Sequence, residues 1–143
     1  MAAAIHAVQM AAYAQEARWL GVTRFEPLER TVDDIRSGDE QFLVARDDAG
    51  RIVGAIGTTF DEATQTVCID SLVVAPDCQR AGIGRRLSTA VIAASRGRDV
   101  VVSTGTRNLP ALSLYASLGF AAIEKRIVGH ERIEITVLRR DAR

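Results

Sequence analysis

The sequence predicts a single domain of mixed α/β class, in which one mostly antiparallel sheet is flanked by helices. The first observation behind this prediction is size: 143 residues, 48% of them hydrophobic, can bury one sizeable core but not two. The second is that strand pairs of the hairpin type occur near both ends of the chain. The third is that two strand-helix-strand crossovers lie between those pairs, which favours one mixed sheet with helices on its faces. We expect residues 1–143 to form this one domain.

Hydrophobic periodicity assigns the individual elements. Apolar residues at helical spacing predict helices, and alternating or continuous β-branched runs predict strands. Gly21 ends the first helix, Thr31 and Asp34 form a capping box that begins the second, and Pro76 stops the third strand, which is apolar enough to be central. We expect helices over residues 2–20, 32–36, 83 to about 97 and 108–118, and strands over 41–46, 52–60, 66–74, 100–103, 121–128 and 132–138.

Composition argues against several classes of protein. Eighteen basic and eighteen acidic residues cancel, so no overall field attracts nucleic acid or an anionic membrane. The N-terminal apolar stretch follows no Lys or Arg and is interrupted by polar residues, unlike a signal peptide, and no run approaches the ~20 apolar residues of a membrane helix. Two cysteines, Cys68 and Cys78, suggest neither a disulfide framework nor a zinc site. We therefore expect a soluble cytoplasmic protein without a metal.

The segment Gln79–Gly84, between the third strand and the next helix, has the features of an anion site. Its two glycines let backbone amides approach a ligand closely, and the amides of a helix's first turn have no partner within the helix. With the helix dipole they suit a phosphate or pyrophosphate, and Arg80, Arg85 and Arg86 add positive charge. The alternative is a tight turn with solvated arginines. The loop lacks the Gly-Lys-Ser/Thr ending of a nucleotide triphosphate loop, and Leu87 occupies the place of a third dinucleotide-fold glycine.

A second motif follows in the helix over residues 108–118. Asn108 and Tyr115 are seven residues apart, about 20° from eclipsed, so they share one helix face and can point into one cleft. The asparagine amide can bond a ligand amide, and the tyrosine hydroxyl can donate a proton to a leaving group. The alternative makes Asn108 a helix cap and Tyr115 a core residue.

Both segments resemble the Gcn5-related N-acetyltransferase (GNAT) superfamily. The stretch Leu72-Val-Val-Ala-Pro-Asp-Cys-Gln-Arg-Ala-Gly-Ile-Gly84 is similar to the family's strand and cofactor loop. Asn108 to Phe120 is similar to the family's next helix, with its Asn, its Leu-Tyr pair and its closing Gly-Phe. The resemblance covers residues 41–138 and implies the GNAT fold. It also implies transfer of an acetyl group from acetyl-CoA to a primary amine, by direct attack in a ternary complex without an acyl-enzyme.

The resemblance further implies roles for single residues. Tyr115 protonates the departing CoA thiolate, and Asn108 binds the pantetheine arm or orders the site. The loop amides bind the pyrophosphate, and backbone groups of the preceding strand pair with the pantetheine like an added strand. The cofactor-binding positions implied in this way are Val73, Val74, Gln79, Arg80, Ala81, Gly82, Ile83, Gly84, Arg85 and Asn108.

An acceptor ammonium must lose a proton before it attacks, so a base is also expected. Asp70 is the first candidate, because it lies in the strand that should border the acceptor site and an unpaired carboxylate in an apolar strand is unfavourable. A hydrogen-bonded structural carboxylate is the alternative reading of Asp70, and Asp61 or Glu62 in the preceding turn are further candidates. The acceptor is a small-molecule or peptide amine that the sequence does not specify. In the family its selection falls to segments that correspond here to residues 21–29 and 128–132.

Two departures from the family pattern bear on assembly and on the cofactor. The family's first strand is absent or cut away, which leaves the edge of the hairpin bare and predicts pairing of two copies into a homodimer. Cys78 stands where relatives often carry an aromatic residue, and Gln79 stands where they usually carry arginine. A non-catalytic acyl-CoA-binding module, or a transferase of another acyl group such as succinyl or propionyl, remains as an alternative function.

Overall fold

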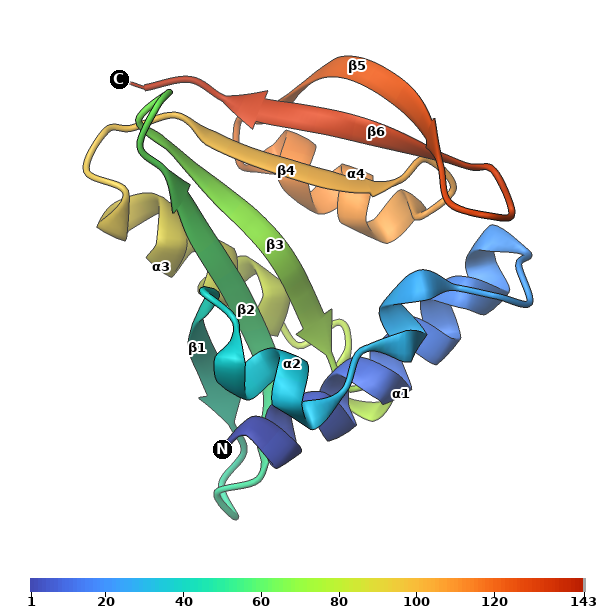
Figure 1. Ribbon diagram of the computed structural model, residues 1–143. Coiled ribbons are helices and arrows are strands. Elements are labelled where there is room, and N and C mark those ends of the chain that lie inside the picture. The colour runs from blue at the N-terminus through green and yellow to red at the C-terminus, as the bar shows by residue number, and fades with distance from the viewer. Residues whose placement is uncertain (143) are drawn as a thin grey trace.

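A computed structural model describes residues 1–142 and contains one six-stranded sheet with helices on both faces (Figure 1). The strand order across the sheet is β1-β2-β3-β4-β6-β5, and every neighbouring pair is antiparallel except β3 with β4. This confirms the predicted mixed α/β class. The elements in chain order are α1 (Ala2–Leu20), the 3-10 helix η1 (Glu26–Glu29), α2 (Val32–Ser37), β1 (Gln41–Arg46), β2 (Ile52–Asp61), β3 (Thr66–Val74), the 3-10 helix η2 (Pro76–Cys78), α3 (Ile83–Ala94), β4 (Val100–Gly105), α4 (Leu109–Ser117), β5 (Ala121–Val128) and β6 (Ile133–Arg140).

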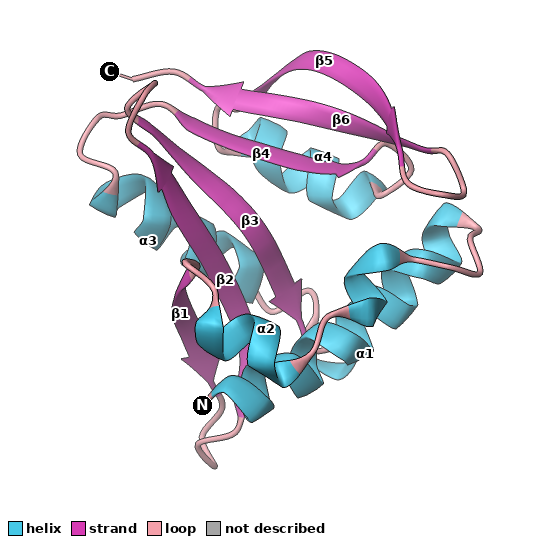
Figure 2. Cartoon of the chain, viewed as in Figure 1, coloured by secondary structure: helices cyan, strands magenta, loops and turns pink. Residues whose placement is uncertain are grey.

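Helices lie on both faces of the sheet (Figure 2), and one hydrophobic cluster on each face holds them there. On one face α1 and α2 contribute Ile5, Leu20 and Ile35, which pack with Ala55 and Val73 of the strands. On the other face α3 and α4 pack on the sheet. That second cluster consists of Val53, Ile56, Ile69, Ala75, Ile83, Leu87, Val91, Val100, Val102, Tyr115, Phe120 and Leu138. The helices of the two faces can therefore meet only where the sheet itself is open.

Most element boundaries match the expectation from the sequence. The capping box of Thr31 and Asp34 is present at the start of α2. β4 runs to Gly105, two residues further than predicted, because it pairs with β6 along its whole length. α3 ends at Ala94, whose side chain is exposed, rather than near residue 97 as predicted. Arg132 lies in the turn before β6 with φ of 52°, and the strand begins one residue later than predicted.

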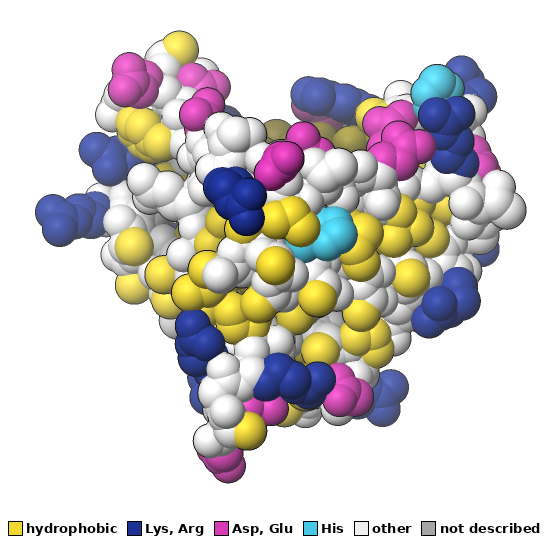
Figure 3. All heavy atoms as spheres, turned by 60° about the horizontal axis from the view of Figure 1, so that its bottom comes forward, with side chains coloured by type: hydrophobic (Ala, Val, Ile, Leu, Met, Phe, Trp, Pro, Cys, Tyr) yellow, Lys and Arg dark blue, Asp and Glu magenta, His cyan; other side chains and the backbone are white. Residues whose placement is uncertain are grey.

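The surface carries mixed charges. On the face seen in Figure 3, basic side chains are separated by acidic and neutral ones around a largely apolar middle. None of the helices among residues 1–142 is long and apolar enough to cross a membrane. β1 forms one edge of the sheet, with Leu43 exposed on it, and pairing of two copies through this edge stays a prediction.

A β-bulge at Asp70 changes the phase of β3. Gly57 of β2 pairs with Ser71, whereas the next residue of β2 pairs with Ile69, so Asp70 is an extra residue without a partner. Ile69 before the bulge and Leu72 after it consequently pack on the same face, three positions apart. The pairing of β3 with β4 also ends at Ile69, so the bulge lies where the two strands part.

Gln9 of α1 is buried without hydrogen-bond partners. Its side chain is fully inaccessible, and neither its amide nitrogen nor its amide oxygen has a partner among the described residues. A buried polar group left unpaired costs about 1–3 kcal/mol of stability. We expect Gln9→Met, which keeps the length of the side chain, to raise the free energy of unfolding by about 1–3 kcal/mol in urea denaturation. Gln41→Met, at an exposed position of β1, is the control and should be near neutral. A loss of stability in Gln9→Met would show that the amide has a partner, such as a buried water.

Candidate active site

β3 and β4 separate beyond the bulge and leave an opening within the sheet. Their parallel pairing covers Val67 to Ile69 and Val100 to Val102 only, and beyond it the strands diverge toward α1 (Figure 1). A cavity of about 870 Å³ occupies this opening. It is lined by α1, β3, β4, the loop before α3, the first part of α4 and the turn between β5 and β6. This volume lies within the range of small-molecule and cofactor sites.

Leu72 and Val74 are the β3 residues whose backbone groups face the opening. The Ala75 amide donates a 2.8 Å hydrogen bond to the Val53 carbonyl of β2, and in an antiparallel pair the residues that face the partner strand alternate. Val73, two residues before Ala75, therefore directs its amide and carbonyl at β2. This corrects the expectation that Val73 pairs with a ligand. Its backbone groups belong to the sheet, and Leu72 takes its place beside Val74.

The loop before α3 presents free backbone amides to the same cavity. α3 begins without a side-chain cap and without an acidic residue in its first turn. The amide of Arg86 bonds to the Gly82 carbonyl at 3.0 Å, so the amides of residues 83–85 have no helical partner. Arg80 and Gly82 have left-handed φ values of 67° and 78°, a backbone form found in anion-binding concavities. A Cβ atom on Gly82 would meet nothing within 4 Å, so the space beside these amides is open to a ligand.

The other loop residues predicted to bind the cofactor differ in whether they line the cavity and in what their side chains contact. Gln79, Arg80 and Ile83 line the cavity, as do Gly84 and Arg85, whereas the exposed Ala81 does not. The Arg85 guanidinium donates to the Ser117 hydroxyl at 2.8 Å, which ties α3 to α4. The Gln79 amide donates to the Val74 carbonyl at 3.3 Å. In this structure the side chain of Gln79 therefore covers one of the two backbone positions that face the opening.

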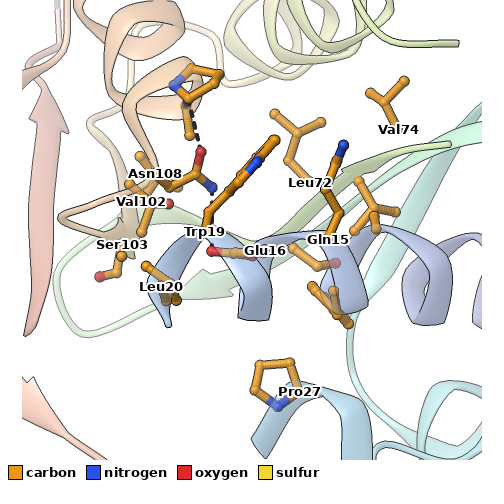
Figure 4. Close-up of a pocket in the computed structure, with 18 of the residues that line it drawn as sticks. Gln15, Glu16, Trp19, Leu20, Pro27, Leu72, Val74, Val102, Ser103 and Asn108 are labelled. Atoms are coloured by element: carbon orange, nitrogen blue, oxygen red, sulfur yellow. Dashed lines mark hydrogen bonds between the residues drawn. The ribbon is translucent and has the colours of Figure 1, made fainter. Parts of the chain in front are cut away.

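Asn108 and Tyr115 both line the cavity from α4, as their spacing predicted. The Asn108 Oδ1 accepts a hydrogen bond from the Ala111 amide at 3.3 Å, so Asn108 is the helix cap. Its Nδ2 donates to Glu16 of α1 at 3.3 Å, so the cap also directs an amide donor across the opening (Figure 4). Tyr115 is 3% exposed and packs against Phe120 with ring centroids 5.4 Å apart. Burial, and to a lesser degree the charge of Glu16, raises the pKa of Tyr115 above its usual value, so the hydroxyl keeps its proton at neutral pH.

Asp70 lies at the rim of the cavity, where the bulge turns it out of the sheet. Its side chain is exposed, and this differs from the expectation of a carboxylate packed in an apolar strand. Partial desolvation still raises the pKa of the Asp70 carboxyl. The other two candidates, Asp61 and Glu62, do not line the cavity, because Asp61 ends β2 and Glu62 lies in the turn before β3, at the opposite end of that strand.

α1 supplies a wall of the cavity that the sequence reasoning missed. Figure 4 shows Gln15, Glu16 and Trp19 projecting from α1 into the cavity. Gln15 accepts a 2.6 Å hydrogen bond from the Gln79 amide, and Glu16 accepts the bond from Asn108. In the sequence these polar residues weaken the apolar stripe of the first helix. Trp19 lies three residues after Glu16 and four after Gln15, so both are its neighbours on the helix surface, and that spacing was the available signal.

The family model described as the acetyltransferase (GNAT) family matches residues 7–120. The chain belongs to the GNAT acetyltransferase family. It is 36% identical over 121 residues to the UPF0157 protein YqkA of Bacillus subtilis (strain 168); the match covers 84% of this chain and 34% of that protein, so the chain spans about a third of its relative's length.

Solved structures agree with the GNAT fold that the sequence predicted. The chain is similar to the ribosomal-protein-S18-alanine N-acetyltransferase from Escherichia coli, with a TM-score of 0.76 and 19% identity over 97% of this chain and 86% of that one. It is also similar to a Bacillus anthracis protein assigned as a streptothricin acetyltransferase and solved in complex with acetyl coenzyme A. That match has a TM-score of 0.65 and 14% identity over 78% of this chain and 67% of the other. At these identities the similarity concerns the fold.

In this GNAT chain, two segments meet at the end of the cavity away from the loop before α3. The Glu131 carboxylate in the β5–β6 turn accepts hydrogen bonds from the Thr23 hydroxyl at 2.7 Å and from the Arg24 amide at 2.6 Å. Hydrogen bonds from Thr23 and Arg24 lower the pKa of Glu131. The segments 21–29 and 128–132, predicted to select the acceptor, are thus joined to each other and both line the cavity.

A buried ion pair of the GNAT domain lies next to the bulge. The Glu40 side chain is 7% exposed and accepts hydrogen bonds from the Arg30 guanidinium and the Ser71 hydroxyl, each at 2.5 Å. Gly57 makes room for it, because a Cβ atom there would lie 1.8 Å from a Glu40 oxygen. The Glu40 carboxylate thus links the bulged region of β3 to the segment between η1 and α2.

Proposed function

We propose that the protein transfers an acetyl group from acetyl-CoA to a primary amine, by direct attack within a ternary complex. The observation that supports this most is that one cavity joins three features: free amides at the start of α3, unpaired β3 backbone, and Tyr115 on α4. Free amides at a helix start suit a pyrophosphate. An open strand edge suits an extended arm that contains amides, as pantetheine does. Acetyl-CoA contains a pyrophosphate, an arm with amides and a thioester, which are the groups that these three features suit.

Acetyl-CoA, when bound, supplies the acetyl group as a thioester. In the proposal the amides of residues 83–85 and the loop from Gln79 hold the pyrophosphate, while Leu72, Val74 and the Asn108 Nδ2 hold the pantetheine. The side chain of Gln79 turns away from the Val74 carbonyl to admit the arm. Tyr115 holds the proton that the sulfur of the leaving group takes up.

The acceptor enters at the end of the cavity formed by η1 and the β5–β6 turn. Trp19 and Phe25 line this part together with the acidic side chains Glu26 and Glu131. Acidic and aromatic groups attract and cover an alkylammonium, which supports an amine as the acceptor.

The first test of the proposed function uses Trp19 as a reporter, because it is the only tryptophan of the chain and it lines the cavity. We expect acetyl-CoA and CoA to change its fluorescence and to stabilise the protein by about 2.7 kcal/mol at a ligand concentration of 100 Kd. ATP lacks the pantetheine arm and should do neither at equal concentration. The variant Trp19→Phe controls for the optical signal. Absence of any response to CoA in fluorescence and in thermal stability would refute the proposed function.

Turnover separates an enzyme from a binding module. CoA release is measured with a thiol reagent, with acetyl-CoA and a panel of primary amines that includes spermidine and a peptide with N-terminal alanine. Amine-dependent release supports the transferase. Tight binding of CoA with no release for any amine would instead favour a non-catalytic acyl-CoA-binding module.

A further inference from the structure

The proposed acetyl transfer needs a group that takes a proton from the acceptor ammonium. The choice of that group rests on the proposed function. An alkylammonium of pKa about 10.4 has no lone pair to attack with until a base has taken its proton. Four carboxylates line the cavity, those of Glu16, Glu26, Asp70 and Glu131. His130 also lines it, from the exposed β5–β6 turn.

Three of these carboxylates are poorly suited to take the proton. Glu131 accepts hydrogen bonds from Thr23 and Arg24, which favour its charged form and lower its pKa. Glu26 is exposed at the rim, beside Gly129 of the β5–β6 turn. Asp70 is exposed at the bulge. Both are more exposed to water than Glu16 and hold an ammonium less firmly, and partial desolvation raises the pKa of Asp70 as well.

Glu16 differs from them in its surroundings. It is half-buried on α1 and makes no ion pair in the part of the chain that the structure describes. Its hydrogen bond from Asn108 at 3.3 Å is long and uses one oxygen, so the carboxylate keeps free acceptor positions toward the cavity. Desolvation raises the pKa of Glu16, and its charge in turn raises the pKa of Tyr115 on α4 and of Tyr13 on α1. The Glu16 carboxylate on α1 and the Tyr115 phenol on α4 line the same cavity.

We propose that Glu16, rather than Asp70, is the base that deprotonates the acceptor amine. The ammonium transfers one proton to the Glu16 carboxylate and becomes a neutral amine. Its nitrogen then forms a bond to the thioester carbonyl carbon, the carbon–sulfur bond breaks, and Tyr115 gives its proton to the sulfur. The second nitrogen proton returns to the Tyr115 oxygen, and Glu16 releases its proton to solvent. The balance is one ammonium and one thioester in, and one amide, one thiol and one proton out.

The test compares two isosteric variants, Glu16→Gln and Asp70→Asn, with the panel amine that the wild-type protein acetylates fastest. We expect Glu16→Gln to lower kcat by about 10²–10⁴-fold and to remove the acidic limb of the pH-rate profile, while CoA affinity from Trp19 fluorescence changes less than about threefold. Asp70→Asn should retain both the limb and most of kcat. Each variant changes one carboxylate only. The other titratable groups that line the cavity are Tyr13, Arg24, Glu26, Cys78, Arg80, Arg85, Tyr115, His130 and Glu131, and both variants leave all of these unchanged.

Two readouts do not depend on turnover. The pKa of Glu16, followed by NMR titration of the side-chain carbon with Glu16→Gln for assignment, should lie above the ordinary value of about 4.3. Because the folded protein then disfavours the charged form, Glu16→Gln should be at least as stable as the wild type at pH 8, and the difference should vanish below about pH 4.

Each outcome of these experiments bears on whether Glu16 is the base. A Glu16 pKa at or below the ordinary value overturns the inference whichever amine is used. A large loss of kcat in Asp70→Asn with an active Glu16→Gln overturns it as well. A parallel loss of CoA affinity and activity in Glu16→Gln would make Glu16 a positioning residue for Asn108. A wild-type protein that does not bind CoA would instead refute the proposed function itself.

Discussion

Replacing Gly82 by valine is expected to abolish measurable CoA binding while the protein stays folded. A Cβ atom at this position meets no protein atom within 4 Å, so the substitution begins in open space. That space lies beside the free amides of residues 83–85, where the pyrophosphate is proposed to sit. Loss of two or three charge-assisted hydrogen bonds, each worth about 1.5–3 kcal/mol, weakens binding by more than about 100-fold. Trp19 fluorescence during CoA titration measures the change.

The control for this variant is Gly50→Val. Gly82 and Gly50 have similar left-handed φ values of 78° and 84°, and a Cβ atom on either meets nothing within 4 Å. Both variants therefore bear the same backbone strain of about 1–2 kcal/mol, but Gly50 lies in the β1–β2 turn and does not line the cavity. Gly50→Val should lose stability and keep CoA affinity. Equal affinities in the two variants would rule out the loop as the phosphate site.

Replacing Tyr115 by phenylalanine is expected to lower kcat by about 10²–10⁴-fold with little change in CoA affinity. The ring is 3% exposed and its packing on Phe120 is unchanged, so the fold and the walls of the cavity persist. What is lost is one proton, held on a hydroxyl whose pKa is raised by burial. Transfer of that proton to the leaving sulfur matters in the transition state and not in the bound complex, so the effect falls on kcat.

The second tyrosine of the chain provides the matched control. Tyr13 also lines the cavity, from α1, and burial raises its pKa to about 12. Its ring packs edge-on against Phe25 at 6.1 Å, on the face of the sheet away from α4. We expect Tyr13→Phe to keep kcat within about tenfold of the wild type. Equal activity of Tyr115→Phe and the wild type would remove Tyr115 from the role of acid.

The parts of the site that the sequence predicted are those encoded by neighbouring residues. The turn before α3 depends on Gly82 and on the start of a helix a residue later, and both can be recognised in a short segment. The shared face of Asn108 and Tyr115 follows from helical geometry alone. The same holds for most elements of the fold, because caps, glycines and alternation act within a few residues.

The parts that could not be predicted depend on contacts between distant segments. Glu16 and Asn108 are 92 positions apart, and only the folded chain shows that they meet across the opening. Val73 was expected as a ligand position from the family resemblance, and the hydrogen bond from Ala75 to β2 that puts Leu72 in its place is visible only in the folded chain. The bulge leaves no trace in a continuous apolar run. For the same reason Asp70 was expected inside the strand, whereas the bulge turns it outward.

At position 70 the presence of an extra residue, and not the type of its side chain, keeps the sheet open. In a strand one residue shorter, the backbone groups beyond Ile69 would remain in step with β4, and the two strands could continue their ladder to the end of β3. The side chains of Leu72 and Val74 would keep their present face, because Ile69 and Leu72 would then be two positions apart in a regular strand. A different side chain at position 70 leaves this arrangement intact. Removal of the position would close the sheet and with it the space that the proposed cofactor needs, so among related chains the length of this strand should vary far less than the residue at its bulge.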